Sequence, residues 1–192
     1  AESDRWFSGA LCCRYLVVRF DKLRLPMFKG RDAAASEWHW ALGFFTNGQI
    51  GVIGAWQDDG AKTPERIADD LHKRGVERIG ALAAETAIVG AMADLGPKAC
   101  KGSATELLES GAFGPRMQRA IRWTDAAGRH LQARLNRVAT RQVPFADRAA
   151  STDFIARAMQ KAERDLLNDC WDRTCPASYG PGAFVASLAG NA

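Results

Sequence analysis

Several signatures of common protein classes are missing from this 192-residue sequence. No apolar run approaches the roughly 18 to 20 residues that a membrane-spanning helix requires. The sequence has no GxSxG motif, no P-loop and no dinucleotide-binding glycine motif. We therefore expect no membrane partner. These absences also argue against the α/β-hydrolases and against the common nucleotide-binding enzymes.

Cysteine and histidine are few and scattered. The five cysteines include no CxxC pair, and the three histidines stand far apart in the chain. Because this spacing does not suit a metal, we expect no structural zinc site. Reduced cysteines in a cytoplasmic protein are one interpretation. A local bridge between Cys170 and Cys175 is the other, and it would indicate an exported protein-interaction domain.

Positive charge is concentrated in one segment. The whole chain has a net charge of only +4, but residues 116–148 contain eight arginines and two acidic residues. Arginines at intervals of three to five can form a stripe along one helix. Such a stripe favours contact with nucleic-acid phosphates, and the alternative is a solvated helix face. The candidate nucleic-acid-binding residues are Arg122, Arg129, Arg134, Arg137 and Arg141.

The first part of the chain predicts three antiparallel strands. Branched and aromatic residues indicate a strand over 12–25. Small and polar residues over 27–36 are expected to interrupt the chain before the next strand. Two apolar runs then flank Asn47-Gly48, which is the strongest short-range hairpin signal because both residues tolerate positive φ.

A helix and a fourth strand follow. Thr63 is expected as the N-cap, Pro64 as the first helical residue and Gly75 as the residue after the end. The apolar residues before Glu85 then indicate a short buried strand. This gives the order β-β-β-α-β.

The remainder predicts helices within one domain. Helical patterns cover 86–96, 103–111, 113–123, 125–142 and 151–171, with a break expected at 96–103. We expect residues 1–170 to form a single domain. Residues 171–192 are rich in glycine and proline and indicate an extended C-terminal arm.

The order β-β-β-α-β is the way in which ribonuclease-H-like folds begin. The expected fold class is therefore α/β, with a ribonuclease-H-like mixed sheet followed by helices. Such folds place one carboxylate on the central first strand, a second at the end of the adjacent fourth strand and a third on a later helix. These carboxylates hold two divalent ions for in-line attack on a phosphodiester. Asp21 and Glu85 lie at the first two places, and oxygen ligands suit Mg²⁺ or Mn²⁺.

Several uncommon residues also recur in a familiar order: IGAW at 53–56, GAK at 60–62 and KRGV at 73–76. In this the chain resembles the catalytic core of Mutator-type bacterial insertion-sequence transposases, a DDE family, over residues 15–85 and more weakly over 122–159. The resemblance implies metal-dependent cleavage or strand transfer on double-stranded DNA, and it allows a homo-oligomer. It also implies Asp21 and Glu85 as catalytic metal ligands and Asp125 as the third catalytic acid.

The chain departs from the family in three ways. Glu85 replaces an aspartate. The third acid belongs around Gly128, where this chain has no carboxylate, and Asp125 is the only acid within a helical turn of that place. The interval before that helix is too short for the family's helical insertion. The sequence therefore resembles a shortened or degenerate copy. Three functions stay open: a transposase-like enzyme, a catalytically inactive domesticated DNA-binding or assembly module, and the exported interaction domain.

Overall fold

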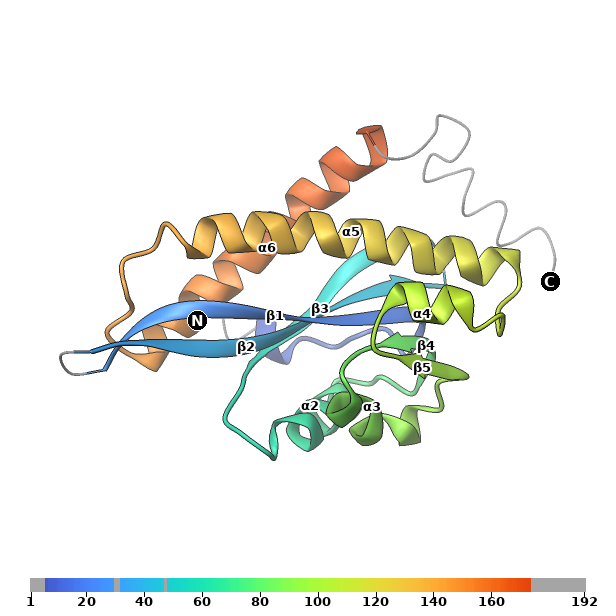
Figure 1. Ribbon diagram of the computed structural model, residues 1–192, viewed down its shortest axis with the longest axis horizontal. Coiled ribbons are helices and arrows are strands. Elements are labelled where there is room, and N and C mark those ends of the chain that lie inside the picture. The colour runs from blue at the N-terminus through green and yellow to red at the C-terminus, as the bar shows by residue number, and fades with distance from the viewer. Residues whose placement is uncertain (1–5, 30–31, 47, 174–192) are drawn as a thin grey trace.

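Five strands form one mixed sheet (Figure 1). The computed structural model describes residues 6–29, 32–46 and 48–173. The sheet has the order β3-β2-β1-β4-β5, in which β1 is antiparallel to β2 and parallel to β4. This arrangement confirms the expected α/β class. The strands are β1 (Arg14–Lys29), β2 (Asp32–Phe45), β3 (Ile50–Gln57), β4 (Arg78–Ala83) and β5 (Ala99–Lys101).

Helices cover both faces of the sheet (Figure 1). On one face lie α2 (Thr63–Lys73) and α3 (Thr86–Ala91), which is followed by the 3₁₀ turn η1 (Ala93–Leu95). On the other lie α4 (Ala104–Glu109) and the long helix α5 (Pro115–Ala139). The last helix, α6 (Arg148–Arg173), packs against α5 and β3. Within the described part of the chain, no helix has the length and apolar character needed to cross a membrane.

The central strand β1 separates two apolar clusters. Val17 and Leu23 belong to the cluster beneath α5, whereas Val18 and Phe20 belong to the cluster beneath α2 and α3. This alternation follows from the two-residue period of a strand. It determines which polar residues of β1 meet α5 and which meet the opposite layer.

Local sequence signals account for most of the boundaries. Gly48 has φ 86° in the hairpin between β2 and β3, and Gly75 has φ 97° after α2. Both are positive values that favour glycine. Ser103 caps α4, because its hydroxyl accepts a hydrogen bond from the Glu106 amide. The N-cap of α2 is Lys62 rather than Thr63, which is instead the first helical residue.

Other expectations need correction. The first two strands extend to residues 29 and 32, so the separation expected over 27–36 is much shorter. The two helices expected over 113–123 and 125–142 are one continuous helix, α5. The expected break at 96–103 contains the edge strand β5. Most of the predicted C-terminal arm, and with it the Cys170–Cys175 bridge, lies outside the described residues.

Candidate functional site

The guanidinium of Arg19 joins β1 to α5 through two carboxylates. Its Nε lies 2.6 Å from Asp21 Oδ2, and its Nη2 donates to Asp21 Oδ1 at 3.1 Å. Its Nη1 lies 2.6 Å from Asp125 Oδ1 and donates to the Asp125 carbonyl oxygen at 2.9 Å. The other Asp125 oxygen accepts from Arg129 at 3.1 Å. The four side chains therefore form a line of alternating charge.

Gly128 of α5 makes room for this guanidinium. A β-carbon at position 128 would lie only 2.8 Å from Cδ and Nε of Arg19. In the parallel ladder Arg19 is also the partner of Ala83, the last residue of β4. The point where β1, the end of β4 and α5 meet is thus occupied by a guanidinium, an alanine and a glycine.

Glu85 belongs to a second group, on the opposite side of β1. Its Oε2 pairs with Lys22 Nζ at 3.0 Å, and its Oε1 is 3.8 Å from His39 Nδ1. The hydrogen bond to Glu85 raises the pKa of Lys22, an effect that outweighs partial burial of the ammonium group. The cation that neutralises Glu85 is therefore Lys22 and not Arg19.

The buried ring of His39 connects Glu85 to Asp58. The side chain of His39 is 4% exposed, and its Nε2 lies 3.3 Å from Asp58 Oδ2. Burial raises the pKa of Asp58, but hydrogen bonds from the Gly60 amide and the Thr63 hydroxyl, together with His39, outweigh it and hold this pKa below its usual value. By accepting these two hydrogen bonds, Asp58 stabilises the turn before α2.

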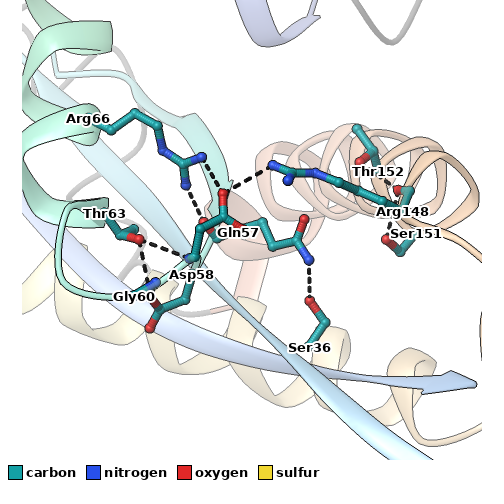
Figure 2. A network of polar contacts seen from close by, with 10 residues as sticks. Ser36, Gln57, Asp58, Gly60, Thr63, Arg66, Arg148, Ser151 and Thr152 are labelled. Atoms are coloured by element: carbon teal, nitrogen blue, oxygen red, sulfur yellow. Dashed lines mark hydrogen bonds and ion pairs between the residues drawn. The ribbon is translucent and has the colours of Figure 1, made fainter. Parts of the chain in front are cut away.

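The turn before α2 also links distant elements (Figure 2). Arg66 of α2 and Arg148 of α6 both reach the Asp59 carboxylate, at 2.5 and 3.2 Å. Arg66 additionally donates to the Gln57 carbonyl oxygen, and the Gln57 amide donates to the Ser36 hydroxyl. The acidic residues of this turn therefore hold β3, α2 and α6 together, which is a structural role.

Asp21 and Glu85 line one shallow hollow of about 360 Å³, although their side chains bind different cations. Lys22 and His39 also line it. Asp125 does not line this hollow. The structure thus brings Asp21 and Asp125 together through Arg19, and it leaves Glu85 in the other group.

These residues do not fit a pair of divalent ions. The position between Asp21 and Asp125 is filled by the Arg19 side chain, and Oε2 of Glu85 pairs with Lys22. Among the described residues, no group of three or more His, Cys, Asp and Glu side chains is arranged to hold a metal ion. Hard cations need several free oxygen ligands in one place.

The candidate arginines of α5 divide into paired and unpaired residues. Arg129 pairs with Asp125, and Arg134 pairs with Asp165 of α6 at 3.1 Å. Arg122, Arg137 and Arg141 are exposed and form no side-chain ion pair with another described residue. At about 100° per residue, Arg122, Arg129 and Arg137 lie on one side of the helix. This side is the basic surface that the sequence predicts; Arg141 lies just beyond the helix.

The sequence indicates the cation of only one acid. On a strand, residues two apart share a face, so Asp21 is expected to pair with nearby Arg19 or Lys22, and the structure shows Arg19. The contact between Arg19 and Asp125 spans 106 residues and had no local signal. Likewise, only the fold brings Lys22 and His39 to Glu85.

Two comparisons with known proteins assign the chain to no family. No protein-family model matches the chain, and no curated protein is significantly similar to it.

Proposed function

We propose that this chain is a ribonuclease-H-like domain that binds double-stranded DNA through the exposed arginines of α5 and does not cut it. The observation that carries the proposal is the Arg19 guanidinium, bound to both Asp21 and Asp125 beneath Gly128. The proposal keeps the fold and partner implied by the Mutator-type resemblance and omits the metal-dependent chemistry.

The strand order supports the ribonuclease-H-like assignment. The long first strand is central, and the fourth strand lies parallel beside it, after a helix that crosses one face of the sheet. This is the arrangement in which acids on the first and fourth strands become neighbours. Here the ladder partner of Ala83, the last residue of β4, is Arg19 rather than a carboxylate.

The electrostatics of α5 support a DNA partner. Arg122 and Arg137 are exposed, and Arg129 has a side chain that is 70% exposed even though it contacts Asp125. Over this stretch the helix rises about 1.5 Å per residue, so the outermost of these arginines are roughly 22 Å apart. That length allows several phosphates of one duplex to be contacted from a single helix.

One observation favours the enzyme as a second candidate. Asp21 and Glu85 line the same hollow, and a substrate that displaced Lys22 from Glu85 would leave two carboxylates facing it. The 43% exposure of both side chains of that ion pair makes such displacement inexpensive. This candidate requires strand cleavage that depends on Asp21.

The binding proposal is tested by fluorescence anisotropy with a short labelled duplex at several salt concentrations. For the double variant Arg122→Gln/Arg137→Gln we expect about tenfold weaker binding at moderate salt and a salt slope smaller by about two. The matched control is Arg14→Gln/Arg78→Gln, which removes two exposed charges at the starts of β1 and β4. Equal losses in both double variants, or no binding by the wild type, would contradict the proposal.

A further inference from the structure

We infer that Arg19 replaces a metal ion in DNA binding: its fixed positive charge lets a phosphate backbone approach the two aspartates without a divalent cation. The inference rests on the proposed function and extends it, because it concerns how the DNA-binding face tolerates carboxylates next to it. It predicts that the wild-type protein binds duplex DNA without Mg²⁺ and gains no affinity when Mg²⁺ is added.

The contacts place the acid pair next to the DNA-binding face. Asp125 lies on α5 and shares its carboxylate between Arg19 and Arg129. Arg129 belongs to the exposed arginine side of the same helix, whereas Arg19 lies below, with a side chain only 14% exposed. A phosphate that contacts Arg129 is therefore close to the Asp125 carboxylate as well.

Charge balance gives Arg19 its role. The two aspartates and the two arginines together are neutral, so a phosphate meets no net negative charge at this point. Without Arg19 the group has a net charge of −1, and both aspartates are 22% exposed. Screening by water weakens but does not remove their repulsion of a phosphate a few ångströms away. A divalent cation could restore the balance, since carboxylate oxygens are its preferred ligands.

Gly128 gives the Arg19 side chain the space it needs between β1 and α5. The helix is buried at this residue, and a β-carbon there would approach three atoms of the Arg19 side chain to 3.0 Å or less. Glycine in a helix interior is unfavourable relative to alanine. A glycine at this position is therefore explained by the space that the guanidinium occupies.

The test measures duplex affinity by anisotropy in EDTA and in Mg²⁺ at matched ionic strength. We expect the wild type to gain no affinity in Mg²⁺, because Mg²⁺ only competes with its arginines for the phosphates. Arg19→Gln should bind about threefold more weakly than the wild type in EDTA, since one positive charge is lost next to the DNA-binding face, and this difference should close in Mg²⁺. The control is Arg24→Gln, a residue of the same strand that is 73% exposed and pairs with Glu37. Mg²⁺ should change the affinity of this control by the same factor as that of the wild type.

A second readout needs no DNA. The thermal unfolding temperature of Arg19→Gln should rise with Mn²⁺, and that of the wild type and of Arg19→Gln/Asp125→Asn should not. If Arg19→Gln does not fold, Gly128→Ala, which displaces the guanidinium, serves in its place. A folded variant that responds to Mn²⁺ no more than the wild type overturns the inference. If the wild type binds no duplex but the variant is stabilised by Mn²⁺, the proposed function fails while the assignment of Arg19 to a cation position stands.

Discussion

The two faces of β1 neutralise their acids in different ways. On the α5 face, Arg19 is 14% exposed and binds two aspartates from different elements. On the α2 and α3 face, Lys22 and Glu85 are each 43% exposed and form one pair. Exposed pairs contribute little to stability, whereas removal of one partner from a buried network leaves an uncompensated charge. Of these two groups, the Arg19 group is therefore the one whose loss should cost the fold more stability.

The largest effect is expected from a double-mutant cycle between Arg19 and Gly128. Arg19→Ala should lower the free energy of unfolding by about 2–3 kcal/mol, somewhat less than a fully buried pair because the aspartates keep some exposure. Gly128→Ala should destabilise the wild type, since its β-carbon displaces the guanidinium. In the Arg19→Ala background the same change should stabilise by up to about 1 kcal/mol, the helix propensity difference.

Urea denaturation of the four proteins measures this cycle. We expect Gly128→Ala to lower the free energy of unfolding in the wild-type background and to raise it in the Arg19→Ala background. If Gly128→Ala has the same effect in both, the glycine has no connection to Arg19, and the distinction between the two faces of β1 is lost.

The smallest effect is expected for Lys22→Gln, about 0.5 kcal/mol or less at neutral pH. Glu85 raises the pKa of Lys22 in the folded protein. The contribution of this pair is therefore fully present below the ordinary lysine pKa of about 10.4 and is lost as the pH rises through the higher folded value. Denaturation of wild type and variant at neutral and alkaline pH should show a small difference that shrinks only above that range. If Lys22→Gln lowered the free energy of unfolding as much as Arg19→Ala does, the two faces of β1 would not differ in this way.

Much of the sheet was predictable because its signals are local. The hairpin between β2 and β3 with Gly48 at positive φ, the glycine after α2 and the order of the first four strands follow from residues that are adjacent in sequence. The edge strand β5 was missed, since three residues after a Gly-Pro pair carry no periodicity. The break expected near residue 124 was wrong because α5 is held by tertiary contacts: Gln132 accepts from Trp40 and donates to the Lys22 carbonyl oxygen.

The candidate site was predictable only in part. Asp21 lies on β1 as expected, whereas β4 ends at Ala83 and Glu85 is the N-cap residue of α3, although the two acids line one hollow. The sequence indicates Arg19 as a partner of Asp21, but it does not indicate the partners of Asp125 and Asp58. The contacts of Arg19 with Asp125 and of His39 with Asp58 connect residues that are far apart in the chain. A carboxylate alone does not indicate whether a metal or a guanidinium will neutralise it.

The measurement that tests the central claim most directly follows nicking of a supercoiled plasmid in Mn²⁺ by the wild type and by Asp21→Asn, with duplex binding recorded for the same preparations. The account predicts that both proteins bind DNA and that the wild type nicks the plasmid no faster than the variant. Nicking that requires Mn²⁺ and disappears in Asp21→Asn would contradict it and support the metal-dependent enzyme.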